Sequence, residues 1–413
     1  MSGLNEYVII GNGVAAAGCI EGIRSADSDG RITVVSEERH PVYCRPLISY
    51  MLEGKTAPGK MNYRDGGFYE RNGCRVIYGK KAVSLDPVKK SVVLEGGEEL
   101  NYGSACVATG SSPFVPPFSG LETVENKFTF MTLDDAEALK NAVTGESSVL
   151  IVGGGLIGLK CAEGLHGLAG KITVCDLADR ILSSILDSGC AAFVQKHIEE
   201  MGIEFMLSDS ATGFDGNTAL MRSGRKVKFD VLVLAVGVRA NISLVKDAGG
   251  ECGRGISVNG KGETSLPFVY AAGDCTECTD ISSGARRVLA ILPNAYMQGH
   301  AAGVNMAGGE EDFDCAVPMN SAGFFGLHVM TAGSYDGECD DMSSESGIKR
   351  FYVKDGYLTG FILVGQTERA GIYTGLIRNR VPLSEIDLDL MKKIPSNLIF
   401  SSKIRKKRFG KVV

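Results

Sequence analysis

The sequence lacks any apolar run long enough to cross a membrane. No stretch reaches the roughly 18 consecutive apolar residues that a transmembrane helix needs. It also lacks an N-terminal basic segment followed by an apolar core, because MSGLNE leads directly into the strand-like YVIIG. We therefore expect no membrane span, no signal peptide and a cytoplasmic location.

A disulfide framework is missing as well. The twelve cysteines are scattered through 413 residues, several in apolar contexts such as Cys106, Cys161 and Cys175. Without a signal peptide this spacing predicts reduced thiols. Hydrophobic residues make up 44% and charged residues 22%, as in ordinary globular enzymes, and the length suits two or three domains.

Acidic residues are absent from the C-terminal end of an otherwise acidic chain. The net charge is −6, but residues 391–413 hold eight Lys or Arg and no Asp or Glu, so residues 1–390 carry −14. This segment is either a solvated basic tail or a docking arm for an acidic protein. Nucleic acid is not expected as a partner, because the acidic body would repel phosphate.

Glycine is abundant, and two glycine clusters follow the same β-α-β pattern. The first has a strand at 7–11, a helix to about residue 24 and a strand at 32–35; its G-x-G-x-x-A turn contains Gly11, Gly13 and Ala16. The second has a strand at 148–152, a helix to about 168 and a strand at 171–175; its turn contains Gly153, Gly155 and Gly158. Two such units predict two nucleotide-binding domains.

The three turn positions have separate tasks in each unit. The first glycine allows the tight turn, and the second lets the backbone approach a pyrophosphate. The third position keeps the helix close to the sheet. The pyrophosphate then lies at the positive end of the helix dipole.

A carboxylate after the second strand of each unit predicts which nucleotide is bound. Glu37 and Asp176 can each accept hydrogen bonds from an adenosine ribose. A carboxylate at Asp176 favours a free 2′-hydroxyl, and the nearest arginine, Arg180, is four residues further on. We therefore expect NADH rather than NADPH.

Short apolar strands at 105–110 and 231–237 close the two nucleotide domains. Strands predicted at 324–329, 349–353 and 358–364, with an Asp355-Gly356 hairpin turn, indicate a small α+β C-terminal domain.

The order of these motifs resembles the two-dinucleotide-binding-domain flavoproteins of the pyridine nucleotide-disulfide oxidoreductase superfamily. Residues 264–275, TSLPFVYAAGDC, resemble its second FAD motif; 108–110, ATG, and 237–241, GVRAN, resemble its crossover elements. Within this superfamily the sequence most resembles NADH:rubredoxin oxidoreductases and the flavin module of nitrite reductases. This likeness rests on PVYCRPLIS at 41–49 and on residues 360–365 and 376–378.

The resemblance implies an α/β fold with two Rossmann-like domains of the glutathione reductase type and a small α+β domain. The FAD domain would comprise residues 1–125 and 251–315, the NAD domain 126–250, the C-terminal domain 316–390 and the basic tail 391–413. The implied FAD-site residues are Gly11, Gly13, Ala15, Ala16, Glu37, Arg45, Pro46, Ala108, Thr109, Gly110, Gly273, Asp274, Asn294 and Ala295. Those of the NADH site are Gly153, Gly155, Leu156, Ile157, Gly158 and Asp176, with Gly237 at the return from that domain.

The implied activity is transfer of a hydride from NADH to FAD, followed by single-electron delivery to a rubredoxin- or ferredoxin-type iron–sulfur protein or a redox complex, in either direction. No metal site is expected, and both a homodimer and a hetero-oligomer stay open. One alternative is an NADH oxidase or peroxidase that uses Cys44. Another is a flavin-bearing NADH sensor or assembly protein.

Disulfide reductase chemistry is not expected, because the chain has no C-x4-C after the first unit and no histidine in its last 85 residues. Arg45 would depress the pKa of the neighbouring Cys44 thiol, yet the pattern Cys-Arg-Pro-Leu differs from the Cys-Gly-Leu-Pro of single-cysteine relatives and favours a packing residue. A packing role is also favoured for the Cys275-x-x-Cys278 pair over a metal or redox role.

Two cations are the candidate catalytic residues. Relatives place lysine or arginine near flavin N5, which points to Arg45. Lys160 stands where relatives keep a glutamate, and Glu163, one turn later, offers it an acid partner. We expect Lys160 either to raise the flavin potential or only to extend to solvent. A helix beginning near Asn294 would direct its dipole at the flavin.

Overall fold

The computed structural model describes residues 5–409, which separate into two compact units. Unit 1 contains the residues up to Asp179 together with Gly202–Thr279 and Arg286–Asp314. Unit 2 contains Arg180–Met201, Asp280–Ala285 and the residues from Cys315 onward. No helix in residues 5–409 is long and apolar enough to cross a membrane.

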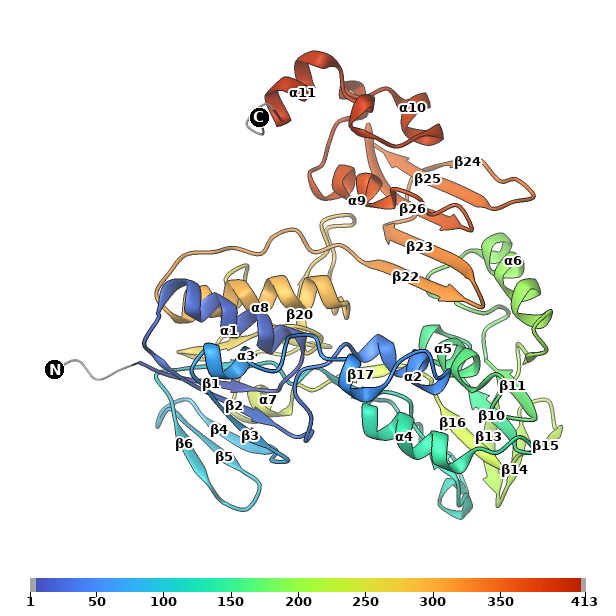
Figure 1. Ribbon diagram of the computed structural model, residues 1–413, viewed down its shortest axis with the longest axis horizontal. Helices are drawn as coiled ribbons and strands as arrows, with labels where there is room; N and C mark the ends of the chain where they lie inside the picture. Colours follow the sequence, from blue (N-terminus) through green and yellow to red (C-terminus); the bar gives the residue numbers. More distant parts are fainter. Residues whose placement is uncertain (1–4, 410–413) are drawn as a thin grey trace. The chain divides into compact units, whose positions relative to one another are not determined.

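Unit 1 contains two parallel five-stranded sheets (Figure 1). The first has the order β19-β7-β1-β2-β3, and its strands are Glu6–Ile10 (β1), Arg31–Ser36 (β2), Cys74–Tyr78 (β3), Ser104–Val107 (β7) and Val269–Ala271 (β19). Residues 7–10 of β1 are all buried, which is typical of parallel strands covered on both faces.

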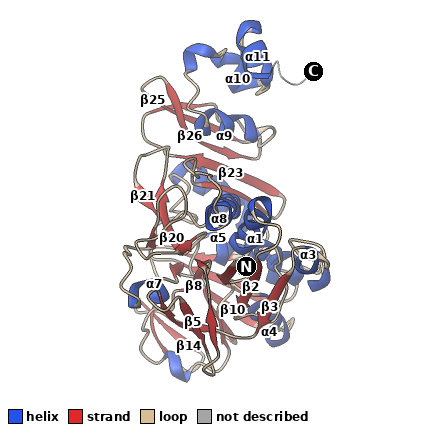
Figure 2. Cartoon of the chain, turned by 90° about the vertical axis from the view of Figure 1, so that its left-hand side faces the viewer, coloured by secondary structure: helices blue, strands red, loops and turns tan. Residues whose placement is uncertain are grey.

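The helix that follows β1, Val14–Ala26 (α1), packs closely against Leu292–Met306 (α8) (Figure 2). Glycines permit the close approach: a Cβ on Gly18 would lie 2.3 Å from the Tyr296 carbonyl oxygen, and one on Gly303 would lie 2.1 Å from that of Cys19. The first sheet is accompanied by a separate antiparallel sheet of Ala82–Asp86 (β4), Ser91–Leu94 (β5) and Glu99–Asn101 (β6) and by the short helix Phe68–Arg71 (α3).

The second parallel sheet has the order β12-β11-β10-β16-β9. Its strands are Lys127–Phe128 (β9), Ser148–Val152 (β10), Lys171–Cys175 (β11), Glu204–Met206 (β12) and Val231–Leu234 (β16). It is accompanied by Leu133–Ala142 (α4), Leu156–Leu165 (α5) and an antiparallel meander of Ala211–Asp215 (β13), Thr218–Met221 (β14) and Lys226–Lys228 (β15). Two parallel sheets with β-α-β connections confirm the predicted α/β class.

The remaining elements of unit 1 are short. Ser111–Pro113 (β8) pairs with Val238–Ala240 (β17), and Ile256–Ser257 (β18), Thr276–Thr279 (β20) and Arg286–Arg287 (β21) form a small sheet. The unit also contains two short α-helices, Ile48–Leu52 (α2) and Ser243–Asp247 (α7), and the 3-10 helices Arg45–Leu47, Pro58–Lys60 and Leu121–Thr123.

Unit 2 is built on an antiparallel sheet of order β22-β23-β26-β25-β24. The strands are Met319–Phe324 (β22), Leu327–Gly333 (β23), Glu338–Asp341 (β24), Ile348–Lys354 (β25) and Tyr357–Val364 (β26), and Ala370–Arg378 (α9) packs on them. Asp355 and Gly356 form the predicted hairpin turn, both with positive φ.

One strand prediction is wrong. Residues 324–329 are not a continuous strand, because Phe325 (φ 50°) and Gly326 (φ 86°) form a tight turn between β22 and β23. The run Phe-Phe-Gly-Leu is apolar, but its glycine supplies the left-handed conformation that a two-residue hairpin requires.

A helix from the middle of the chain, Ser188–Glu199 (α6), belongs to unit 2 rather than to the second parallel sheet. Asp187 caps it and forms an ion pair of 2.5 Å with Arg350 of β25. His197 is hydrogen-bonded to the Phe325 carbonyl, and the Tyr335 hydroxyl donates to the Ile185 carbonyl at 2.7 Å. The sequence places residues 188–199 in the NAD domain, 126–250, and Phe325, Tyr335 and Arg350 in the C-terminal domain.

The basic C-terminal segment contains two helices, Leu388–Lys393 (α10) and Ser402–Phe409 (α11). Three of its apolar side chains, Met391, Ile399 and Phe400, are buried in the core of unit 2. Lys392 forms an ion pair with Asp340 of β24. Part of the predicted tail is therefore packed against the sheet.

Candidate functional site

The turn after β1 has the conformation that the first glycine motif predicts. Gly11 has φ +112°, and a Cβ there would lie 2.1 Å from the Ala108 carbonyl oxygen. Gly13 forms the N-cap of α1 without a side-chain cap, and nothing lies within 4 Å of where its Cβ would be. The first amides of α1 therefore face open space, which suits a pyrophosphate. Ala15 and Ala16 are buried in the first turn of α1.

The turn after β10 repeats this geometry. Gly153 has φ +119°, and Gly155 caps α5 with no atom within 4 Å of a Cβ. Gly158 lies so close to the turn that its Cβ would be 1.9 Å from the Gly153 carbonyl oxygen. Leu156 and Ile157, in the first turn of α5, are half-buried. The second motif thus leaves an uncapped helix terminus for another phosphate group.

The two carboxylate side chains predicted to bind an adenosine ribose differ in their surroundings. Glu37 is exposed and forms an ion pair of 3.3 Å with Lys81. Asp176 accepts hydrogen bonds from the backbone N–H groups of Gly154 at 2.6 Å and Ala178 at 2.8 Å. Asp176 therefore stabilises the phosphate turn as well as presenting a carboxylate beside it.

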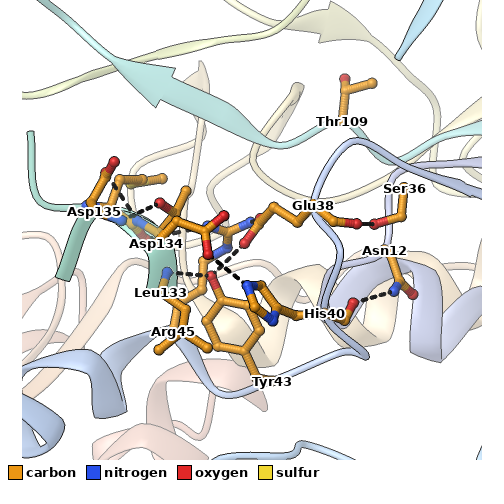
Figure 3. Close-up of polar contacts among 12 residues, drawn as sticks. Asn12, Ser36, Glu38, His40, Tyr43, Arg45, Thr109, Leu133, Asp134 and Asp135 are labelled. Atoms are coloured by element: carbon orange, nitrogen blue, oxygen red, sulfur yellow. Dashed lines mark hydrogen bonds and ion pairs between the residues drawn. The ribbon is translucent and has the colours of Figure 1, made fainter. Parts of the chain in front are cut away.

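Arg45 is held in a polar cluster in the chain segment that follows β2 (Figure 3). Its guanidinium forms an ion pair with Glu38 and donates to the Met131 carbonyl at 3.2 Å. The Tyr43 hydroxyl donates to Glu38 at 2.7 Å and accepts from the Leu133 amide at 2.9 Å. Figure 3 shows the Arg45, Tyr43 and Glu38 side chains pointing toward one another. Pro46, the next residue, is exposed in the short 3-10 helix Arg45–Leu47.

Asp274 has no hydrogen-bond donor among the described residues. Burial raises the pKa of its carboxyl, and the charge of Arg45 lowers it in part. A part-buried carboxylate without donors is costly unless a ligand supplies them. The hydroxyl groups of a flavin ribityl chain would do so, and FAD therefore fits this position.

The turn before Asp274 brings three elements of the first nucleotide site together. Gly273 lies against α1 and α8, since its Cβ would be 2.9 Å from Ala15 Cβ and 3.5 Å from Ala295 Cβ. Its backbone N–H donates to the Gln298 side chain at 2.9 Å. Asn294 and Ala295, in the first turn of α8, are buried.

The two crossover elements are joined by reciprocal hydrogen bonds. The Thr109 hydroxyl donates to the Asn241 carbonyl, and the Asn241 side-chain amide donates to the Thr109 carbonyl, both at 2.9 Å. The Asn241 backbone N–H donates to the Gly110 carbonyl at 2.9 Å. Ala108 is buried at the end of β7, whereas Gly237 is exposed with φ +110°.

Lys160 lies on the face of α5 that packs against α2. Its ammonium donates to Glu163 and lies 4.8 Å from the centre of the Tyr50 ring. The Lys160 side chain is 17% exposed and that of Glu163 is 7% exposed, so this pair is largely shielded from solvent. A second lysine, Lys55, lies on the same Tyr50 ring at 5.7 Å.

No two of the twelve cysteines are joined by a disulfide in the described part of the chain. The expected depression of the Cys44 pKa is wrong: burial raises it, and the neighbouring Arg45 guanidinium is engaged by Glu38. Burial also raises the pKa of Cys275 to about 12. All twelve cysteines are free thiols, and among residues 5–409 no group of His, Cys, Asp and Glu could hold a metal ion.

Sequence reasoning missed Glu38 and Tyr50. Glu38 follows the strand end at Ser36, whose hydroxyl donates to the Glu38 carbonyl at 2.7 Å. That turn directs the Glu38 side chain toward Arg45, while Glu37 stays in solvent. Tyr50 had a local signal, because it lies in the same short helical stretch as Arg45, but its contact with Lys160 spans 110 residues.

The relatives found by comparison with known proteins are named as NAD(H)-dependent or electron-transfer proteins. NADH-dependent phenylglyoxylate dehydrogenase subunit epsilon of Aromatoleum evansii is 30% identical over 92% of this chain and 93% of its own. The ferredoxin–NAD(+) reductase component of the biphenyl dioxygenase system of Paraburkholderia xenovorans is 26% identical over 96% of this chain and 98% of its own. The assimilatory nitrate reductase electron transfer subunit of Bacillus subtilis is 29% identical over 94% of this chain, which spans 50% of that protein.

A solved structure of the covalent putidaredoxin reductase–putidaredoxin complex has the same fold, with a TM-score of 0.87 and 22% identity over 95% of this chain and 97% of that one. The profile of the pyridine nucleotide-disulphide oxidoreductase family matches residues 5–299. These matches make the protein an oxidoreductase that uses FAD and NAD(H). The chain belongs to the pyridine nucleotide-disulphide oxidoreductase family.

Proposed function

We propose that the protein oxidises NADH and passes the electrons through FAD to a small iron–sulfur protein. When bound, FAD accepts two electrons as hydride and releases them singly. The observation that carries this proposal is the pair of uncapped helix termini at Gly13 and Gly155, which give one chain two places to bind a dinucleotide pyrophosphate. Relatives that are ferredoxin–NAD(+) reductases support the choice of acceptor.

We assign the first nucleotide site to FAD. In this proposal the uncapped amides of α1, beyond Gly13, bind the pyrophosphate, and Glu37 accepts from the adenosine ribose. Asp274 accepts hydrogen bonds from the ribityl hydroxyls, and the crossover element at Thr109 and Gly110 forms the rim of the FAD site. The N-terminus of α8, at Asn294, faces the flavin pyrimidine and stabilises negative charge there.

We assign the second site to NADH, with Gly155 at the pyrophosphate and Asp176 at the ribose. Residues 1–125 and 251–315 would then act as the FAD domain and 126–250 as the NAD domain. Arg45 is proposed to stabilise charge on the reduced flavin. Because Glu163 neutralises much of the Lys160 charge, we propose that Lys160 tunes the flavin potential less than a free cation would.

The acceptor assignment is tested by NADH-driven reduction of ferredoxin and rubredoxin, each followed by its own absorbance under anaerobic conditions. We expect rapid reduction of at least one of them, together with turnover of the artificial acceptor ferricyanide. Turnover of ferricyanide without reduction of either protein would refute the iron–sulfur acceptor. Slow bleaching of the flavin with a long-lived charge-transfer band would favour the sensor alternative.

An NADH oxidase or peroxidase is the second enzymatic candidate, because such relatives use a cysteine near the position of Cys44. The variant Cys44→Ser separates the two. We expect full NADH:ferricyanide turnover and no change in oxygen consumption, since the thiol is part-buried and burial raises its pKa. Loss of oxygen or peroxide reduction in Cys44→Ser would establish a redox role. We also infer a cytoplasmic location, which the twelve free thiols support.

A further inference from the structure

The chain from Lys393, the last residue of α10, onward combines exposed apolar side chains with several exposed lysines. Ile394 and Leu398 are 58% and 65% exposed and lie four residues apart in the sequence. Lys393, Lys403, Lys406 and Lys407 are exposed in the same segment. We call these six residues the C-terminal basic surface.

This surface is fixed to unit 2 by its own backbone and core contacts. Ile399 and Phe400 are buried, and Ile404 of α11 packs against the same core. The Asp387 amide donates to the Ile399 carbonyl at 2.7 Å, and the Tyr373 hydroxyl donates to the Met391 carbonyl at 3.0 Å. Ile394 and Leu398 are therefore displayed on a structured segment.

The lysines of α11 have no acidic partner in the described part of the chain. Lys403 lies three and four residues before Lys406 and Lys407, so these like charges repel one another along the helix. Lys392 shows the contrast, because it is neutralised by Asp340. An external carboxylate surface would relieve the repulsion on α11.

We propose that the C-terminal basic surface docks an acidic protein, whose carboxylates pair with its lysines while its apolar side chains cover Ile394 and Leu398. The proposal rests on the proposed function, in which the acceptor is a small iron–sulfur protein. Residues 1–390 carry −14 and would repel an acidic partner, so docking needs a local region of opposite charge.

An anionic membrane is the competing occupant, because it also attracts lysines. Membrane-surface helices insert an apolar face between the lipid headgroups. The described apolar side chain of α11, Ile404, instead packs inward against unit 2. The observations therefore favour a protein partner.

The test uses the full-length, FAD-loaded protein and an oxidised acidic [2Fe–2S] ferredoxin as the probe. Binding is measured by calorimetry at low and high salt for wild type, for Lys403→Glu/Lys406→Glu/Lys407→Glu and for Ile394→Ser/Leu398→Ser. The matched control reverses three exposed lysines elsewhere, Lys140→Glu/Lys226→Glu/Lys228→Glu, and so changes the net charge equally. NADH-driven reduction of menadione, an uncharged acceptor, is followed in parallel.

We expect the α11 charge reversal to raise the ferredoxin Kd about tenfold at low salt, with little difference at high salt. The serine variant should raise the Kd severalfold at both salt concentrations, and the control should bind nearly as wild type. Menadione reduction should be unchanged in all of them. Tight docking without electron transfer to ferredoxin would contradict the proposed function and leave the docking surface intact.

Equal Kd values for wild type and the α11 variant would overturn the docking surface, as would a wild type that does not bind the ferredoxin at low salt. Binding of wild type and the α11 variant to vesicles of phosphatidylserine and phosphatidylcholine tests the membrane alternative. If the α11 variant loses vesicle binding but keeps ferredoxin binding, the surface is a lipid site and the proposal is wrong.

Discussion

Asp176 has two tasks that depend on one carboxylate. It accepts hydrogen bonds from the backbone N–H groups of Gly154 and Ala178. We propose that it also accepts a hydrogen bond from a hydroxyl of the adenosine ribose. Asp176→Ala should lower the ratio of kcat/KM for NADH over NADPH by about 10- to 100-fold, since a hydrogen bond to a charged group contributes roughly 1.5–3 kcal/mol.

The two cofactors are compared by initial rates with ferricyanide, and the melting temperature reports on the turn. Asp215→Ala, which removes an exposed acid elsewhere in the same nucleotide segment, is the control and should leave the ratio unchanged. A wild-type enzyme that uses NADPH more efficiently than NADH would contradict the assignment.

Lys160 and Glu163 are mutually dependent because both are largely shielded. Removing one partner of such a pair leaves a shielded charge, which typically costs about 3 kcal/mol. We expect Lys160→Met to destabilise unit 1 by about that amount, and Lys160→Met/Glu163→Gln to recover at least half of it. Thermal or urea unfolding of the two single variants and the double variant gives the coupling energy.

The flavin midpoint potential of the same variants tests the tuning role. We expect Lys160→Met to lower the potential and the double variant to lie near wild type, because a neutral pair is replaced by neutral groups. A potential that stays constant across the series would leave Lys160 with a structural role alone.

The sequence predicted the local backbone geometry of the glycine turns. Gly11, Gly13, Gly153 and Gly155 were assigned from their spacing, and each has the turn geometry that the spacing implies. Glu38 could not be chosen over Glu37, because the choice depends on where Arg45 lies after folding. The pKa of Cys44 was predicted in the wrong direction, because the sequence showed its adjacency to Arg45 but not the burial that raises the pKa.

At the level of elements, the two glycine turns offer a matched pair of substitutions. Gly13 and Gly155 both have extended backbone angles that any residue can adopt, and both have free space where a side chain would project. Gly13→Leu should therefore fold but fill the proposed pyrophosphate site of FAD, giving a protein purified without flavin absorbance. Gly155→Leu should retain its flavin and lose reduction by NADH by at least about 100-fold.

Flavin content and stopped-flow reduction check this pair, and dithionite should still reduce the flavin of Gly155→Leu. Gly59→Leu, which also has no atom within 4 Å of a Cβ, controls for the added side chain. The reverse pattern, with flavin lost in Gly155→Leu, would exchange the two assignments.

The elements themselves were predictable to different degrees. Buried parallel strands such as β1 and β10 were found because their apolar runs end in glycine turns. The hairpin at Phe325-Gly326 was read as a strand, because an apolar turn has the composition of a strand and only its φ angles distinguish it. The membership of α6 in unit 2 had no local signal, since it depends on contacts with β25 and β26, about 150 residues later.

For the whole molecule, the interleaved chain path predicts that unit 1 cannot be isolated by truncation alone. A fragment ending at residue 314 would retain α6 but lose the core that buries Cys190, Val194 and Ile198. We expect that fragment to aggregate or to bind the dye ANS. Replacing residues 180–201 by a Gly-Ser linker in the same fragment should restore a monodisperse, FAD-binding protein, as judged by size-exclusion chromatography and flavin content. A monodisperse 1–314 fragment would show that α6 folds without unit 2.

The position of α6 also has a consequence for biosynthesis. The ribosome completes this helix at residue 199, but the sheet on which it packs is complete only at Val364. At about 5–20 residues per second the helix waits roughly 10–30 seconds for its partner strands. During that interval its apolar face is open to trigger factors and other nascent-chain binders. Synonymous codon choices that slow elongation between α6 and β26 should therefore reduce the yield of native protein more than equal delays placed after residue 364.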